Sequence, residues 1–283
     1  MKNILIVVHP DRVDAISQGS EFAALIKDKG FQPLTNRADL ILNAKEFHSD
    51  LKLDCVVVFG GDGTILRAAE IAKNTEAPII GVNLGKVGFL AEISKPPLNS
   101  IVEAIMSGNI VVEPRLTIAY KILRGSEEIE SGWALNEIVV ERSNTSLLEL
   151  FVQIDDRPLS RWACDAVICS TPTGSTAYAF SAGGPVVWPE VDAMVLLPLA
   201  AHALFSDPMV VSPNSVVVID IESEKAEISA DGIRKFKLLE GDRVVVTKDP
   251  WKVKLAHIDN SVFTDRLVAK FKLPIEGWRG EGV

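Results

Sequence analysis

The chain of 283 residues is poor in cysteine: it has only Cys55, Cys164 and Cys169, and no two of them form a Cys-x-x-Cys pair. A disulfide scaffold is therefore not expected, and such sparse cysteine is typical of proteins in a reducing cytoplasm. The four histidines are scattered along the sequence and form no metal-ligand motif. We accordingly predict no dedicated metal site made by the protein alone.

The sequence also lacks long apolar runs and an excess of positive charge. Its first apolar run, residues 4–8, ends at His9-Pro10 and is too short for a signal-peptide core or a membrane span. The formal net charge is -9, so a long polyanion such as DNA is repelled on average. These features predict a cytoplasmic protein that binds neither a membrane nor nucleic acid.

Strand-like and helix-like segments alternate over residues 1–112. The apolar runs at 4–8, 55–59 and 78–82 have the continuous hydrophobicity of strands buried on both faces. Helical stripes lie between and after them, and Gly30 and Gly108 are plausible stops for two of the helices. The pattern predicts an α/β domain with a parallel, Rossmann-like sheet over residues 1–112.

The character of the sequence changes at Glu113-Pro114. Alternating or β-branched stretches follow, as in residues 148–155, and turn signals such as Asp155-Asp156 separate them. We predict a mostly β, sandwich-like domain over residues 113–262. The basic and apolar tail, residues 263–283, is expected to pack back on the first domain.

A glycine-rich motif, Gly60-Gly61-Asp62-Gly63-Thr64, stands at a strand-to-helix junction. Glycines let backbone N–H groups approach a ligand, and a helix N-terminus favours anions, so Gly60, Gly61, Gly63 and Thr64 are candidate phosphate-binding residues. An aspartate in such a loop repels phosphate unless it accepts a proton from an attacking hydroxyl or holds Mg²⁺. The alternative is that Asp62 only caps the helix.

A hydroxyl-rich run, residues 170–178, follows the apolar strand predicted at residues 167–169. It offers many hydrogen-bonding groups at a strand end, where ligands commonly bind; the alternative is a polar surface turn.

Polar residues interrupt the apolar pattern of residues 134–140 at Asn136-Glu137. Neighbouring residues of a strand point to opposite faces, so at least one of the pair is expected to face inward, where a ribose diol can satisfy a carboxylate. The alternative is a solvent-facing pair at a strand end. Asp165 is a candidate for a base or sugar hydroxyl, or for a turn cap, and Arg67 and Lys86 are candidates for phosphate contacts or for solvated surface positions.

With these three motifs in this order, the sequence resembles the NAD kinase family over nearly its whole length, and residues 177–189 and 263–280 look most like the actinobacterial branch. The resemblance implies that Asp62 accepts the proton of the adenosine ribose 2′-hydroxyl of NAD. It also implies a set of NAD-binding positions. These are Asp62, Gly63, Arg67, Asn136, Glu137, Asp165, Thr176, Ala177, Tyr178, Ser181 and Ala200.

The resemblance further implies ATP or inorganic polyphosphate as phosphoryl donor, a divalent cation such as Mg²⁺ that arrives with ATP, and a homodimer or homotetramer. Two positions depart from the family pattern: Ala166 replaces a usual glycine, and Ala163 stands where many members have a basic residue. Two alternatives remain: a lipid or sugar kinase that shares the glycine-aspartate loop, and a nucleotide-binding sensor without turnover.

Overall fold

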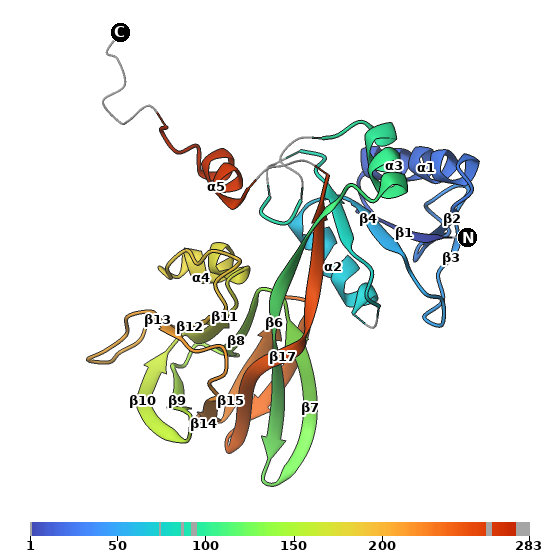
Figure 1. The fold of residues 1–283 in the computed structure, drawn as a ribbon. Coiled ribbons are helices and arrows are strands. Elements are labelled where there is room, and N and C mark those ends of the chain that lie inside the picture. The colour runs from blue at the N-terminus through green and yellow to red at the C-terminus, as the bar shows by residue number, and fades with distance from the viewer. Residues whose placement is uncertain (1, 74, 86–87, 92–94, 259–261, 276–283) are drawn as a thin grey trace. The chain divides into compact units, whose positions relative to one another are not determined.

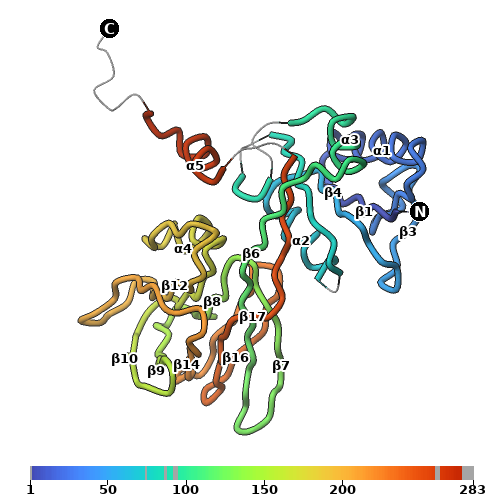
Figure 2. Tube along the Cα trace, viewed as in Figure 1, coloured from blue at the N-terminus to red at the C-terminus, as the bar shows by residue number. Residues whose placement is uncertain are grey.

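The computed structural model describes residues 2–73, 75–85, 88–91, 95–258 and 262–275 (Figure 1). The chain divides into two compact units, residues 1–114 with 253–283 and residues 115–252. Two long strands, β6 (Val111–Arg124) and β17 (Asp242–His257), carry the chain from one unit to the other, as the tube in Figure 2 traces.

A parallel sheet forms the centre of the first unit, in the order β5-β4-β1-β2-β3. The last residues of β17 extend it, because Leu255 and Ala256 pair in parallel with β5. The strands are β1 (Asn3–Val8), β2 (Gln32–Thr35), β3 (Lys45–Glu46), β4 (Cys55–Phe59) and β5 (Ile79–Val82). Every residue of β4 is buried, as the apolar run predicts. The expected α/β class of this part of the chain is confirmed.

The helices of the first unit are α1 (Val13–Asp28), α2 (Asp62–Ala72), α3 (Leu98–Ser107) and α5 (Phe263–Phe271). The apolar face of α2 is buried, because Ile65, Ala68, Ala69 and Ala72 recur at helical spacing. Gly30 and Gly108 follow α1 and α3 with φ of 84° and 72°, a left-handed conformation that favours glycine. Across the described residues, every helix is too short or too polar to cross a membrane.

Two antiparallel sheets form the second unit. The first joins β10 (Arg157–Cys164), β9 (Leu148–Ile154), β14 (Val217–Ile221), β17, β6 and β7 (Glu127–Ala134). The second has the order β13 (Met209–Val211), β12 (Met194–Leu199), β11 (Ala166–Ser170), β8 (Glu137–Arg142), β15 (Lys225–Ala230) and β16 (Arg234–Leu239). The expected β-rich class of this part is therefore confirmed.

The core of the second unit lies between its two sheets, since one apolar cluster draws on strands of both. Alternate residues of the second sheet point away from that core. Val139, Ile168 and Leu197 pack instead with Ala179 of the short helix α4 (Tyr178–Ser181), beside β11 in Figure 1. The middle of the second sheet is thus buried on both faces, and α4 covers its outer face next to the hydroxyl-rich run.

Candidate functional site

In the first unit, the glycine-rich loop connects β4 to α2 at the carboxyl edge of the parallel sheet. Gly61 is the N-cap of α2, and its carbonyl accepts the N–H groups of Thr64 and Ile65 at 2.9 and 3.2 Å. A Cβ at Gly60 would lie 2.4 Å from Oγ1 of Thr64, so the turn needs glycine at this position. This edge is where ligands of open α/β sheets bind.

Asp62 is the first residue of α2, and its half-buried carboxylate is held by another loop. Phe89 N–H donates to Oδ2 at 3.0 Å, and Leu90 N–H donates to Oδ1 at 3.2 Å. The capping alternative is wrong, because Gly61 occupies the N-cap position and Asp62 follows it as the first residue of the helix; among the described residues no side-chain hydrogen bond caps this end. Two backbone donors fix the direction of the carboxylate while each oxygen keeps a lone pair for a further donor.

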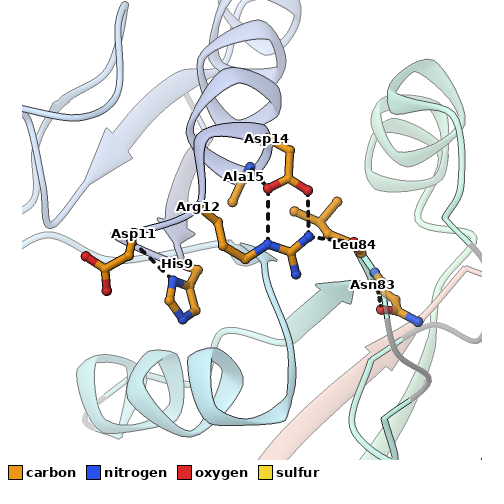
Figure 3. A network of polar contacts seen from close by, with 8 residues as sticks. His9, Asp11, Arg12, Asp14, Ala15, Asn83 and Leu84 are labelled. Carbon is orange, nitrogen blue, oxygen red and sulfur yellow. Dashed lines mark hydrogen bonds and ion pairs between the residues drawn. The ribbon is translucent and has the colours of Figure 1, made fainter.

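The loop that follows β5 lies beside the start of α1 (Figure 3). Arg12 forms a two-point ion pair with Asp14 and donates from Nη2 to the Leu84 carbonyl at 2.6 Å. Asn83 Oδ1 accepts the Gly85 N–H at 2.9 Å, which tightens the same turn. Arg12 is thereby a half-exposed cation anchored at the carboxyl edge of the sheet, and sequence reasoning had not singled it out.

The structure says less about the two basic residues that the sequence suggested for phosphate contacts. Arg67 lies on the exposed face of α2, and Lys86 lies outside the described residues. A surface hollow is lined by residues 49–54, which precede β4 in the chain, and by residues 75–77, which precede β5. The hollow therefore lies at the amino ends of these two strands. It is therefore separate from the glycine-rich loop.

In the second unit, Asn136-Glu137 lies at a junction between two strands. The expectation of a single strand through residues 134–140 is wrong: β7 ends at Ala134 and β8 begins at Glu137. The expectation of an inward-facing residue is confirmed, because Glu137 is 8% exposed. The solvent-facing alternative is wrong for that side chain.

Glu137 is a buried carboxyl group with spare hydrogen-bonding capacity. Burial, and then the nearby charge of Asp231, raise its pKa to about 8, and the N–H of Tyr178 opposes the shift. Its Oε2 atom is buried and has no hydrogen-bond partner within the described residues. A ligand with hydroxyl donors can supply that partner.

The hydroxyl-rich run, residues 170–178, is a buried loop, so the surface-turn alternative is wrong for residues 171–175. Its hydroxyl groups mainly hold the protein together. Thr171 Oγ1 donates to the Leu135 carbonyl, and Ser175 Oγ donates to Pro172 O at 2.7 Å and accepts the Val187 N–H at 2.9 Å. The loop is therefore held by internal hydrogen bonds over residues 171–175, and residues 176–178 form its more exposed end.

Gly174 allows the loop to approach the Asn136-Glu137 junction. A Cβ there would lie 2.1 Å from the Asn136 carbonyl oxygen, a contact that no side chain tolerates. Thr171 N–H donates to the same carbonyl at 2.8 Å. The structure therefore brings together the two motifs that the sequence presents about 35 residues apart.

The remaining candidates lie around α4 and the far end of β11. Tyr178 begins α4, and burial, followed by the charges of Glu141, Asp165 and Glu137, raises the pKa of its phenol. Asp165 precedes β11 and pairs with Arg142 at 3.0 Å. Thr176 and Ala177 are half-buried, Ser181 is exposed, and exposed Ala200 has a φ of 52° after β12. Ala163 and Ala166 flank Asp165 at the same strand ends.

Sequence reasoning missed Asp231 and Arg234, which lie against the Asn136-Glu137 junction. Asp231-Gly232 is the turn between β15 and β16, with φ of 53° and 66°. An Asp-Gly pair between two β patterns is a strong hairpin signal, so the turn was recognisable. The contact between the Asp231 carboxylate and residues 135–137 could not be recognised from the sequence.

Replacing Glu137 by glutamine is expected to flatten the pH dependence of stability. The folded carboxyl ionises near pH 8 rather than the ordinary 4.5, so the folded state binds more protons between these values. The wild-type free energy of unfolding therefore falls as pH rises through that window, by about 2–4 kcal/mol. Glu137→Gln removes this fall, which urea unfolding at pH 5 and pH 8 measures.

Burial also raises the pKa of Asp231, to about 6. This group therefore adds a smaller fall in the free energy of unfolding as pH rises, and Glu137→Gln retains that fall. The control is Glu149→Gln, on the exposed face of β9. It is expected to show the same fall in the free energy of unfolding between pH 5 and pH 8 as the wild type. An equal fall in Glu137→Gln and Glu149→Gln contradicts the assignment of a raised pKa to Glu137.

Two family models match the chain. Residues 35–110 match the ATP-NAD kinase N-terminal domain, and residues 135–258 match the ATP-NAD kinase C-terminal domain. An NAD kinase of Leifsonia xyli subsp. xyli is 44% identical over 98% of this chain and 96% of that protein. An NAD kinase of Mycobacterium bovis is 47% identical over 81% of this chain and 75% of its own length.

Solved structures show the same architecture. The yeast NADH kinase complexed with NADH has a TM-score of 0.90 at 22% identity, over 100% of this chain and 90% of that one. At that identity the likeness shows the fold. An NAD kinase from Archaeoglobus fulgidus in complex with ATP has a TM-score of 0.74 at 25% identity, over 96% of this chain and 99% of that one.

Proposed function

The chain belongs to the NAD kinase family, and from that membership we propose that it phosphorylates the 2′-hydroxyl of the adenosine ribose of NAD to give NADP. The phosphoryl donor is ATP, with inorganic polyphosphate as a second candidate. The observation that carries the proposal is the Asp62 carboxylate, which two backbone N–H groups hold at the start of α2 beside a glycine-rich loop.

In the proposed reaction, Asp62 accepts the proton of the 2′-hydroxyl as that oxygen attacks the γ-phosphorus. A bond forms between the ribose oxygen and phosphorus, the bond from phosphorus to the bridging oxygen breaks, and ADP leaves with its electron pair. The assigned phosphate-binding residues are Gly60, Gly61, Gly63 and Thr64. The N–H groups of Gly61 and Gly63, together with the N-terminus of α2, stabilise the phosphate charge, while the N–H groups of Gly60 and Thr64 donate to the carbonyls of Val82 and Gly61 and hold the loop in shape.

We assign the binding of NAD mainly to the second unit. Glu137 accepts hydroxyl donors of a ribose through its buried oxygen, an interaction supported by the absence of a partner for Oε2 within the described residues. The other assigned positions are Asp62, Gly63, Arg67, Asn136, Asp165, Thr176, Ala177, Tyr178, Ser181 and Ala200. The hydroxyl-rich loop supports the Asn136-Glu137 junction, because Thr171 Oγ1 donates to the Leu135 carbonyl and Thr171 N–H donates to the Asn136 carbonyl.

We propose that Mg²⁺ enters with ATP. Within the described residues no group of three histidine, cysteine or acidic side chains is arranged to hold a metal ion, so the triphosphate and water are its expected ligands. We also propose a cytoplasmic homodimer or homotetramer without nucleic-acid or membrane partners; the net charge of -9 and three free, buried cysteines are consistent with this.

The test is an assay with ATP, Mg²⁺ and one of three acceptors: NAD, a diacylglycerol or fructose 6-phosphate. NADP formation, followed with an NADP-specific dehydrogenase, is the expected result. Phosphorylation of the lipid or the sugar alone overturns the proposal in favour of a related kinase. Tight binding of NAD without NADP formation, under every donor tried, overturns it in favour of a sensor.

A further inference from the structure

We propose that Asp231, in the turn between β15 and β16, is a positioning residue for NAD, because its carboxylate holds the backbone of the Asn136-Glu137 junction. The inference rests on the proposed function, in which that junction binds NAD. Asp231 lies about 95 residues from the junction in sequence, and no motif that the sequence presents includes it.

The Asp231 carboxylate accepts three consecutive backbone N–H groups. Leu135 donates to Oδ2 at 2.9 Å, and Asn136 and Glu137 donate to Oδ1 at 2.7 and 3.3 Å. The two segments also bond in the opposite direction, because the Asp231 N–H donates to the Glu137 carbonyl at 3.0 Å. The side chain is 2% exposed, so water does not compete for these bonds. Three donors at the gap between β7 and β8 thus depend on one carboxylate.

Arg234 fixes that carboxylate from the other side. Its Nη2 donates to Asp231 Oδ2 at 3.1 Å and to the Trp133 carbonyl at 2.6 Å. The guanidinium also lies 4.7 Å from the centroid of the Trp133 ring. Arg234 therefore ties the hairpin turn to the strand that leads into the junction, and it balances the buried negative charge.

The same peptide segment supports the hydroxyl-rich loop on its carbonyl side. The Asn136 carbonyl accepts Thr171 N–H at 2.8 Å and the Ser170 hydroxyl at 3.2 Å. Residues 135–137 are therefore held through N–H groups by Asp231 and through carbonyls by the loop. If the Asp231 carboxylate shifts, the Asn136-Glu137 junction and the hydroxyl-rich loop are both expected to move, and the Glu137 side chain moves with the junction.

Only a carboxylate satisfies this arrangement. It offers two acceptor oxygens and no donor, whereas an asparagine amide points its own N–H groups at one or more of the three backbone donors. Asp231→Asn is therefore expected to shift the junction while keeping the side-chain volume. The Asp231 and Arg234 side chains bond to backbone groups of residues 133–137 and to each other, so the effect is expected to fall on the binding of NAD.

The experiment compares Asp231→Asn with Asp155→Asn in the full-length protein. Asp155 is a matched control: it occupies a β-hairpin turn of the same unit with a φ of 51°, and its carboxylate accepts the Val216 N–H at 2.8 Å and the Ser215 hydroxyl at 2.9 Å. We expect Asp231→Asn to raise KM for NAD about tenfold, with kcat and KM for ATP within about threefold of wild type. Asp155→Asn leaves all three constants unchanged, although both variants lower Tm.

An unchanged KM for NAD in Asp231→Asn, alongside a lowered Tm, overturns the inference, and so does an equal loss of kcat for both variants. If Asp231→Asn does not fold, Arg234→Lys replaces it, with an expected rise in KM for NAD of about threefold. Equilibrium binding of NAD to each protein is measured as well. If wild type makes no NADP, the proposed function fails, and the ratio of NAD dissociation constants still decides the role of Asp231.

Discussion

Asp62→Asn is expected to lower kcat for NADP formation by about 10²–10⁴-fold, with the dissociation constant of NAD within about threefold of wild type. Asparagine keeps the size of the side chain but cannot accept a proton at neutral pH. Single-turnover rates and equilibrium binding of NAD measure the two quantities separately. A large loss of rate without a loss of binding is what removal of a general base produces.

The matched control is Asp265→Asn. Asp265 is also in the first turn of a helix of the first unit, and its carboxylate accepts the Val262 N–H at 2.9 Å. Its replacement is expected to change kcat by less than about threefold. Wild-type turnover in Asp62→Asn removes that residue from its assigned role, and an equal loss of NAD affinity assigns it to binding instead.

Local patterns made much of the first unit predictable. The buried run at residues 55–59 and the apolar face of α2 appear as expected, since burial on both faces and helical spacing leave signals within a few residues. Gly30 as the end of α1 is a similar case. The glycine-rich loop was found because a strand, a turn and a helix follow one another without interruption.

Longer strands were harder to predict. Residues 244–247 and 252–255 look like two strands, but both belong to the single strand β17, which continues through Pro250. Likewise, β6 runs across Pro114, where the change of composition suggested only a boundary. Proline removes one ladder hydrogen bond, so pattern reasoning breaks a strand there unless the partner strands are known.

The candidate site was predictable in its residue types and unpredictable in its contacts. The hydroxyls of Thr171 and Ser175 suggested ligand contacts, but the fold directs them to carbonyls of the protein. One residue of the Asn136-Glu137 pair was expected to face inward, but Asp231, the like-charged neighbour of the buried Glu137, comes from a distant hairpin. Such contacts depend on strand pairing between distant segments, which one sequence does not reveal.

Gly88→Ala is expected to lower kcat about 10²-fold without any change to the proposed base itself. A Cβ at Gly88 would lie 2.1 Å from Oδ1 of Asp62 and 2.7 Å from its Cγ. The carboxylate must then leave the N–H groups of Phe89 and Leu90 that aim it. The expected cause is therefore the steric contact between the added methyl group and the Asp62 carboxylate.

Gly85→Ala is the control for this prediction, because a Cβ at that position of the same loop makes only an ordinary van der Waals contact, with Arg12 Nη1 at 3.7 Å. It is expected to keep kcat within about twofold of wild type. The decisive comparison is the double variant with Asp62→Asn. If the added methyl acts through the carboxylate, Gly88→Ala costs little further rate once Asp62 is asparagine, so the two effects are far from additive. Additive losses mean that Gly88 acts on another part of the site, and the geometry of Asp62 then does not set the rate.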